Sequence, residues 1–295
     1  MISSLYRRIL PIKARTIIYS GFLGKLLFVK RNFKTLFRSK ITYLFRFMLP
    51  KTETNQVFAF IGKHGITSYP YKYKLAYDIL NINVYLDEKL NLHYVIHHEN
   101  KLYFPEAHSE EKIRKDYLAL LIEQDPSSSH RYVKSYNELS GKILLDVGSA
   151  EGIFALDTIE MTKQVILFEC EDYWLKPLKA TFAPWLHKVQ FVKKYVGNKT
   201  DGNFITIDDF FSFEPQNNIF IKMDIEGAER NALEGAKNTL RHSNNIQLAV
   251  CTYHRQNDPE YISELMIKNG YSIEFSEGFM FWNKRLSKGV IRCIK

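Results

Sequence analysis

Cysteine is scarce in this sequence: three residues, Cys170, Cys251 and Cys293, occur among 295. No two of them have the Cys-x-x-Cys spacing of a zinc site or a redox motif, and an odd count is untypical of a disulfide framework. These absences exclude a small disulfide-stapled domain and a zinc knuckle. We therefore expect reduced thiols and a cytoplasmic location.

Long apolar runs are also missing. The longest one near the start, "TIIYSGFLG" followed by Lys25 and "LLFV", is shorter than the roughly 20 apolar residues that a transmembrane helix needs. No small-residue cleavage site follows it, and more positive charge does, which is untypical of a secretory signal. We expect neither a membrane-spanning helix nor a signal peptide.

Acidic residues are absent from residues 1–50, which hold eleven lysines and arginines. The formal net charge of the whole chain is +9, so the remainder is close to neutral. The alternation of basic and large apolar residues in "LLFVKRNFKTLFRSKITYLFRFMLP" is typical of amphipathic helices on an anionic membrane surface. It also fits a helical arm whose apolar residues pack on the body of the protein, and the sequence leaves both open.

Internal repeats and low-complexity linkers are absent too, and the chain divides into three expected regions: 1–50, 51–138 and 139–295. The first is the basic amphipathic arm. In the second, "VFAFIG" and "INVYLDEKLNLHYVIHHENKLYFP" predict short strands of a small β meander. The segment "SEEKIRKDYLALLIEQ" then predicts a helix with Ser109 as its cap.

The third region alternates regularly between apolar strands and helices. Its strands are expected at "KILLDVG", "QVILFEC", "VQFVKKYVG", "IFIKMDI" and "IQLAVCTY", and "YSIEFS" and "GVIRCIK" end the chain. Buried strands separated by helices predict a doubly wound, mostly parallel sheet. In such sheets ligands bind beyond the carboxyl ends of the strands.

The turn after the first of these strands, "DVGSAEG", is a candidate cofactor site. Gly148 and Gly152 allow close backbone approach, and the N–H groups at the helix start, around Ser149 and Glu151, offer hydrogen bonds. Asp146 stands where a dinucleotide fingerprint has its first glycine, which disfavours a nicotinamide cofactor. It suits a ligand with a cationic amino group, such as the methionine part of S-adenosylmethionine (SAM). A plain strand-to-helix turn is the alternative.

Two further acids are candidate cofactor contacts. Glu169 ends the next strand, twenty-one residues after Gly148, close to the roughly 20 expected for an acid that binds ribose hydroxyls. The alternative is a solvated carboxylate at a strand end. Asp208, in "TIDDF", is expected either to cap a helix or to contact adenine.

The motifs "DVGSAEG", "FE", "TIDDF", "IKMDIEGAE" and "TYHRQND", in this order, resemble the FkbM family of SAM-dependent methyltransferases over roughly residues 124–282. The stretch "EQDPSSSHRY" resembles a subset found beside bacterial surface-polysaccharide genes. The resemblance implies a Rossmann-like class I methyltransferase fold with seven strands, the last of them antiparallel. It also implies O-methylation of a hydroxyl, often on a sugar or a polyketide, and we expect a sugar of a surface glycan or its precursor. Ala150 and Cys170 depart from the pattern, at a middle glycine and at a proline, which puts the adenosine pocket in question.

The candidate catalytic residues follow the fourth and fifth strands. His254, in "TYHRQND", is the first choice for the base that removes the acceptor proton, because histidine titrates near neutral pH. A hydrogen-bonded structural histidine is the alternative, and His130 is the reserve base. Asp224 and Glu226 would orient the hydroxyl or hold a divalent cation. Two carboxylates at a strand end are weak support for a metal, so none is assigned.

Other activities fit the sequence less well. A catalytically silent, membrane-associated scaffold with this fold would have no need for the pocket residues. Nucleic acid is an unfavoured acceptor, because "DIEG" stands where enzymes that methylate base amino groups have a Pro-Pro-aromatic motif. A glycosyltransferase would need an Asp-x-Asp site, and none is evident. A lipid or polyketide acceptor remains an alternative to the glycan or glycolipid, and the expected location is the inner face of the membrane.

Overall fold

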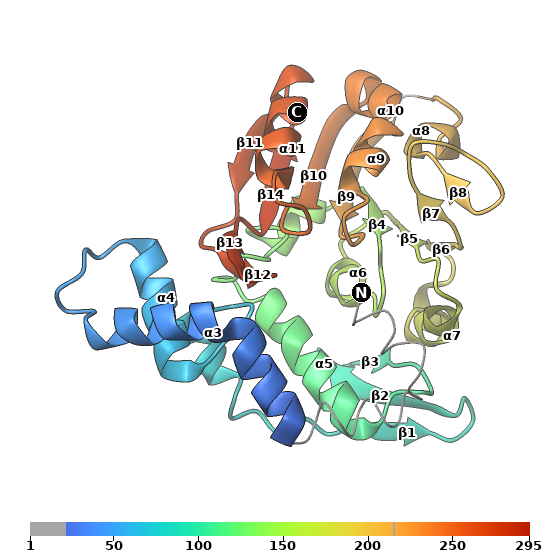
Figure 1. Cartoon of the computed structure of the whole chain (residues 1–295). Helices are drawn as coiled ribbons and strands as arrows, with labels where there is room; N and C mark the ends of the chain where they lie inside the picture. Colours follow the sequence, from blue (N-terminus) through green and yellow to red (C-terminus); the bar gives the residue numbers. More distant parts are fainter. Residues whose placement is uncertain (1–21, 215) are drawn as a thin grey trace. The chain divides into compact units, whose positions relative to one another are not determined.

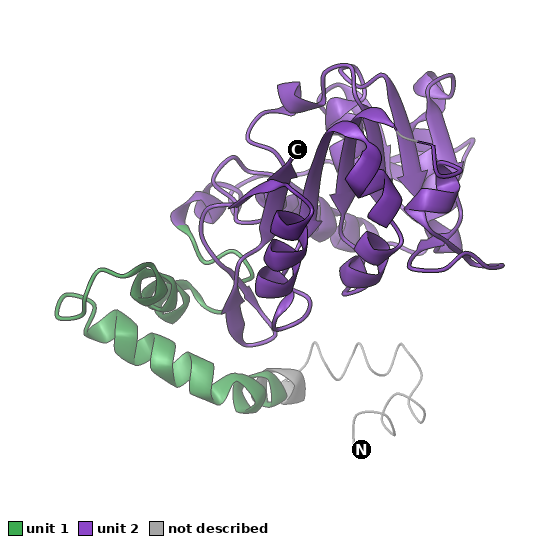
Figure 2. Ribbon diagram, turned by 90° about the horizontal axis from the view of Figure 1, so that it is seen from above, with its two compact units in different colours: residues 1–71 green, residues 72–295 purple. Residues whose placement is uncertain are grey.

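The structure is a computed structural model that describes residues 22–214 and 216–295 (Figure 1). It divides into two compact units, residues 1–71 and 72–295 (Figure 2). Residues 1–21 of the expected basic arm lie outside the described part. The single boundary after Tyr71 differs from the expected divisions after residues 50 and 138, because the segment beyond residue 50 forms a helix that packs on the arm.

The described part of the first unit is a pair of helices, α3 (Phe22–Leu44) and α4 (Glu53–His64). The strand predicted at "VFAFIG" is wrong, because these residues lie within α4. The side chain of Thr52 caps this helix by accepting a hydrogen bond from the Asn55 N–H. Val57, Phe58 and Ile61 are buried, a spacing that places them on one helical face.

The second unit begins with the expected small meander. After the short helix η1 (Lys72–Ala76), β1 (Tyr85–Asp87), β2 (Leu92–His97) and β3 (Asn100–Tyr103) pair antiparallel. The predicted helix follows as α5 (Glu110–Glu123), with the Ser109 side chain accepting from the Lys112 N–H. A short helix, η2 (Tyr136–Leu139), leads into the main sheet.

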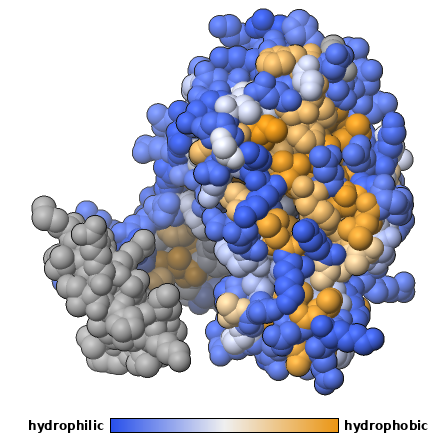
Figure 3. Space-filling view, turned by 90° about the vertical axis from the view of Figure 1, so that its right-hand side faces the viewer, coloured by the Kyte–Doolittle hydropathy of each residue, from blue (hydrophilic) through white to orange (hydrophobic). Residues whose placement is uncertain are grey.

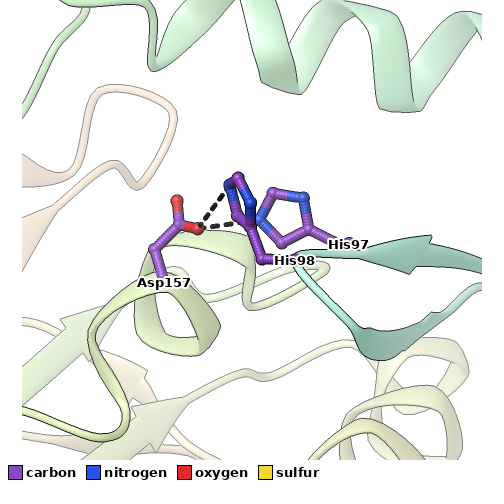
Figure 4. Close-up of side chains that lie close together, drawn as sticks. All are labelled: His97, His98 and Asp157. Atoms are coloured by element: carbon purple, nitrogen blue, oxygen red, sulfur yellow. Dashed lines mark hydrogen bonds and ion pairs between the residues drawn. The ribbon is translucent and has the colours of Figure 1, made fainter.

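The meander is fastened to the main domain by His97, at the end of β2. Its Nε2 lies 2.7 Å from Oδ1 of Asp157, and its Nδ1 lies 2.9 Å from the Tyr117 hydroxyl of α5. Figure 4 shows His97 and His98 beside Asp157. The other carboxylate oxygen of Asp157 accepts a hydrogen bond of 2.6 Å from Tyr136. This buried cluster joins β2, α5 and the main domain.

The main sheet confirms the predicted architecture. Its strands are β4 (Ile143–Val147), β5 (Gln164–Phe168), β6 (Val189–Val192), β9 (Asn217–Met223), β10 (Asn244–Cys251), β11 (Ser272–Phe275) and β14 (Val290–Ile294). They lie in the order β11-β14-β10-β9-β4-β5-β6. Each pair of neighbours that excludes β14 is parallel, and β14 is antiparallel to both β10 and β11.

Helices and smaller strand pairs connect these strands. They are α6 (Ile153–Thr158), α7 (Asp172–Thr181), η3 (Ala183–Trp185), β7 (Tyr195–Val196), β8 (Phe204–Ile205), α8 (Ile207–Phe210), α9 (Glu229–Glu234), α10 (Lys237–His242), α11 (Asp258–Lys268), β12 (Met280–Trp282) and β13 (Arg285–Ser287). Helices α9 and α10 follow each other closely and are separated at Gly235. A Cβ there would lie 2.0 Å from the Gly197 carbonyl oxygen, so two chain segments meet closely at this glycine.

Among the described residues, no helix combines the length and the apolar character that a bilayer crossing requires.

Candidate active site

A cavity of about 500 Å³ opens at the carboxyl ends of β4, β5 and β9. Its size falls within the range of roughly 300–1,000 Å³ that is usual for small-molecule sites. Figure 3 views the side of the molecule that carries α7, β7 and β8, where hydrophobic side chains gather between hydrophilic ones. The cavity lining includes Gly148, Ala150, Phe168, Glu169, Tyr173, Trp174, Tyr195, Phe204, Asp224, Ile225 and Glu226.

The turn between β4 and α6 needs glycine at two positions. Gly148 has φ +80°, and a Cβ there would lie 2.1 Å from the Asp224 carbonyl oxygen. Gly152, with φ +76°, is the N-cap of α6, and a Cβ there would lie 2.8 Å from the Phe182 ring. These glycines bring the ends of β4 and β9 together and bend the chain into α6.

The hydrogen bonds of this turn differ from the expected ones. The N–H groups of Gly148 and Ser149 donate to the Phe168 carbonyl, and that of Gly152 donates to the Ser149 carbonyl. The Ala150 N–H donates to Oε2 of Glu169 at 2.9 Å. These four amides are therefore engaged within the protein, and the turn shapes the cavity by its backbone path.

Asp146 does not line the cavity. Parallel pairing of β4 and β9 places it opposite Lys222, whose Nζ lies 2.9 Å from Oδ1 of Asp146. Both side chains are buried, and Lys222 also donates to the Gly148 carbonyl at 2.6 Å. Burial raises the pKa of Asp146, although Lys222 opposes this shift. The cation that Asp146 meets in the structure is Lys222. Its expected contact with a cofactor amino group stays a prediction.

Glu169 lies where the sequence predicts a ribose contact. It lines the cavity and is only 7% exposed. Oε1 accepts from the Glu171 N–H at 2.8 Å, and Oε2 accepts from Ala150. A carboxylate has about four acceptor sites, so two backbone bonds fix its orientation and leave capacity for two ligand hydroxyls.

Three other expected cofactor residues lie outside the cavity lining. The Ser149 hydroxyl lies 3.4 Å from the Phe168 carbonyl oxygen. Glu151 lies close enough to Glu123 and Asp116 for their charges to act on it; burial first, and these acids next, raise its pKa to about 7. Asp208 accepts four hydrogen bonds from Asn238 and Thr239, so it caps α10, in line with the capping alternative.

Asp224 is the centre of the polar end of the cavity. Its carboxylate accepts from the Tyr132 hydroxyl at 3.1 Å and from the Tyr253 hydroxyl at 3.3 Å. His130 and His254 lie 3.5 and 3.6 Å from its oxygens. Burial would raise the pKa of Asp224, but His130, Lys222 and His254 together hold it well below the usual value. Asp224 is therefore a fixed negative charge at the strand end.

His254 is held in one orientation by Glu229. Its Nδ1 lies 2.8 Å from Oε1 of Glu229, which also accepts from the N–H groups of Ile225 and Gly227. Because Oε1 of Glu229 acts as a hydrogen-bond acceptor, the ring proton of neutral His254 lies on Nδ1. Nε2 then carries the lone pair that can accept a proton. Nε2 is buried and has no hydrogen-bond partner among the described residues.

The electrostatics around Nε2 favour a proton on it. Nε2 lies 3.6 Å from Oδ1 of Asp224 and 3.7 Å from Oε2 of Glu226. Burial alone would lower the pKa of His254, but the hydrogen bond to Glu229 and the three carboxylate charges outweigh it and raise the pKa. Glu226 itself is 86% exposed and stands at the rim.

The site contains residues that the sequence reasoning did not single out. Tyr132, Tyr253, Lys222 and Glu229 all contact its candidate residues. Each lies within one or two positions of a predicted residue or inside a quoted motif. This closeness in sequence is the feature that could have pointed to them. The reserve base His130 is 1% exposed and lies 3.2 Å from the Tyr253 hydroxyl, so it belongs to the same cluster.

Two groups of side chains here have donor atoms close enough for one cation. They are Asp224 with Glu229 and His254, and Asp224 with His130 and Cys251; within each group the atoms lie within 4.8 Å of one another. Both share Asp224, so they describe one polar centre. Its donors fit a divalent cation as well as a proton on His254.

The fold and the cavity define a class of protein. A sheet of this order with an antiparallel last strand, a glycine turn after β4 and an acid at the end of β5 are the features of a class I methyltransferase. The sequence agrees: residues 185–273 match the family described as "Methyltransferase FkbM domain". Together these findings support a methyltransferase that uses SAM.

Solved structures offer only distant likenesses. Precorrin-6y C5,15-methyltransferase from Geobacter metallireducens GS-15 is 12% identical, with TM-score 0.37, covering 57% of this chain and 90% of that one. An rRNA methylase from Streptococcus thermophilus is 11% identical, with TM-score 0.36 and coverages of 54% and 89%. A ribosomal protein L11 methylase from Lactobacillus delbrueckii subsp. bulgaricus is 12% identical, with TM-score 0.36 and coverages of 56% and 78%. At these values the likenesses carry no argument. No curated protein matches the sequence significantly.

Proposed function

We propose that this protein is a SAM-dependent O-methyltransferase whose acceptor is a sugar hydroxyl of a bacterial surface glycan or its precursor. The observation that carries the proposal is the cavity itself, which joins Glu169 at the end of β5 to Asp224 at the end of β9. A cofactor contact and a polar acceptor end therefore share one space. The glycan part rests on the resemblance of the sequence motifs.

The cavity fits the cofactor by the chemistry of its lining. Glu169 would accept hydrogen bonds from the two ribose hydroxyls. Tyr173, Trp174, Tyr195 and Phe204 line the same cavity and offer aromatic surface to an adenine ring. Bound SAM would supply an activated methyl group on a sulfonium.

Asp224 and Glu226 at the other end of the cavity, and His254 beside that end but outside the lining, would prepare the acceptor. Asp224 would accept a hydrogen bond from the acceptor hydroxyl and orient it, as would Glu226 at the rim. Neutral His254 would take the acceptor hydroxyl proton on Nε2, which would leave the oxygen free to receive the methyl group that SAM would supply. General-base help of this kind contributes roughly 10²–10⁴-fold. Glu229 would stabilise the resulting imidazolium.

The same side chains could instead bind a divalent cation. It would bind Nε2 of His254 and Asp224 and would hold the acceptor oxygen without a protein base. A methyl-transfer assay with and without a chelator separates the two: activity that survives EDTA favours the base, and activity restored by Mn²⁺ favours the cation.

The proposal is tested by transfer of a radiolabelled methyl group from SAM to lipid-linked and polymeric surface glycans. Label should enter the glycan fraction and be recovered as an O-methyl sugar after hydrolysis. Label in lipid, polyketide or nucleic acid would move the acceptor to those alternatives. SAM binding without transfer to any acceptor would favour the silent scaffold.

A further inference from the structure

Helix α3 buries polar residues and exposes large apolar ones, which is the reverse of the pattern of a surface helix in a globular protein. Its buried residues include Asn32, Ser39 and Thr42, which are 8%, 0% and 7% exposed. Asn32 and Thr42 satisfy their polar groups within the helix, by donating to the carbonyls four residues earlier. The inner face of α3 is thus built from small polar residues, where a helix of a globular protein has apolar ones.

The contact between α3 and α4 uses a glycine for close approach. A Cβ on Gly62 of α4 would lie 2.1 Å from the Ser39 carbonyl oxygen and 2.8 Å from Cβ of Tyr43. Small residues that let two helix backbones approach are typical of helix pairs in lipid, where large apolar side chains are left to face the lipid.

The large apolar residues of α3 point outward. Leu26, Phe33, Phe37 and Leu44 follow one another at intervals of seven, four and seven residues, which places them in one stripe. They are 49%, 60%, 58% and 59% exposed, and the rings of Phe33 and Phe37 stack at 5.9 Å. Phe45, Phe47 and Met48 after the helix are exposed as well. A contiguous apolar surface of this kind marks an interaction site.

The charges around this stripe select its partner. By helical position, Lys30, Lys34 and Lys40 flank the stripe, and residues 1–50 contain no acid. A second copy of the chain would bring the same positive charges to the contact. Anionic lipid headgroups would neutralise them while the acyl region takes up the Leu and Phe side chains.

We infer that the α3–α4 pair is a membrane-docking element that lies in the headgroup layer of an anionic bilayer, with the stripe of α3 inserted. This goes beyond methyl transfer and does not depend on it. It chooses between the two interpretations that the sequence left open for the basic arm, and it assigns the contact to named side chains.

The test is flotation of the full-length protein with vesicles of phosphatidylcholine alone or mixed with phosphatidylglycerol. Wild type should float with the mixed vesicles. The double variant Phe33→Ser, Phe37→Ser should lose at least about tenfold in affinity, because two apolar side chains no longer transfer from water. Lys34→Gln, Lys40→Gln should weaken the preference for the anionic vesicles.

The matched control is Leu186→Ser, Ile267→Ser, since these residues of the second unit are each 58% exposed, as Phe37 is. It should float like wild type, and all variants should keep the melting temperature of wild type. The inference is overturned if wild type fails to float, or if the Phe33, Phe37 variant floats equally well. Conversion of a wild-type dimer to a monomer by that variant would also overturn it, because the stripe would then serve a second copy.

Discussion

Two buried clusters in this protein each join a histidine to a carboxylate, and they differ in how the second ring nitrogen is used. His97 meets Asp157 at 2.7 Å, and its other ring nitrogen meets the Tyr117 hydroxyl. Burial raises the pKa of Tyr117 to about 12, so this hydroxyl keeps its proton, and it shares a hydrogen bond with Nδ1. Both ring nitrogens are thus used, and the cluster is closed.

His254 is equally buried but open. Glu229 fixes Nδ1, whereas the nearest oxygens of Asp224 and Glu226 lie 3.6 and 3.7 Å from Nε2, too far for hydrogen bonds. The comparison teaches that burial and a carboxylate partner do not identify a functional histidine. We propose that a functional histidine is marked instead by a ring nitrogen that the protein has oriented and left without a hydrogen-bond partner, as in His254 within the described part of the chain.

The largest effect is expected from replacing His254, the histidine whose Nε2 is unpaired among the residues that the structure describes. His254→Asn should lower the kcat of methyl transfer by roughly 10²–10⁴-fold, the usual contribution of a general base. Its free energy of unfolding should change little in comparison. His187→Asn, at an exposed histidine, is the control and should keep full activity. Retention of wild-type kcat by His254→Asn would remove the distinction between the clusters.

The closed cluster should respond in stability. Asp157→Ala removes the acceptor of both His97 and Tyr136, and each buried donor left unpaired costs about 1–3 kcal/mol. Urea unfolding should therefore show a loss of about 2–6 kcal/mol for the two donors together. His98→Ala, at a ring that is 77% exposed and 3.8 Å from Asp157, is the matched control and should change stability by less than about 0.5 kcal/mol. Equal losses in the two variants would contradict this assignment.

Glu151 sharpens the comparison as an acid whose strongest charged neighbours, Glu123 and Asp116, are acids as well. Its pKa is about 7 in the fold and near 4.5 otherwise, so folding loses stability as the pH rises through this interval. Glu151→Gln should be more stable than wild type at pH 8, by at most about 3 kcal/mol, since one pKa unit is about 1.4 kcal/mol. The two proteins should unfold alike near pH 4. A difference that does not depend on pH would point to packing instead.

The smallest expected effect is on the pH dependence of the open histidine. The raised pKa of His254 places the acidic limb of the kcat/KM profile above the ordinary histidine value, because only the neutral ring accepts a proton. Glu229→Gln removes the largest stabilisation of the charged ring and should move this limb to lower pH. An unmoved limb would mean that another group is the base.

Much of the fold could be predicted because it is written in regular patterns. The alternation of apolar strands and helices from residue 142 onward specifies the parallel sheet, and the cap at Ser109 fixes the start of α5. "VFAFIG" was misleading, since its aromatic and β-branched residues favour strands, whereas the cap at Thr52 begins a helix that packs on α3. Tertiary contact decided there against local preference.

The sequence predicted the position of the site in the fold better than it predicted the contacts of the individual side chains. Glu169 and Asp224 follow β5 and β9, the two parallel strands on either side of β4, and the sequence pattern reveals both strand ends. The partner of Asp146 depends on the register of β4 against β9, which no local pattern shows. The same holds for Asp208, whose partners lie thirty residues away on α10.

The most direct test of the account is calorimetric titration of SAM into wild type and Glu169→Ala. Wild type should bind in the micromolar range, and Glu169→Ala should bind at least about tenfold more weakly, a loss of about 1.4 kcal/mol. Glu264→Ala, at an exposed glutamate of α11, should bind like wild type. Absence of binding heat from the folded wild type at several temperatures, or equal affinity of Glu169→Ala, would contradict the assignment of this cavity to the cofactor.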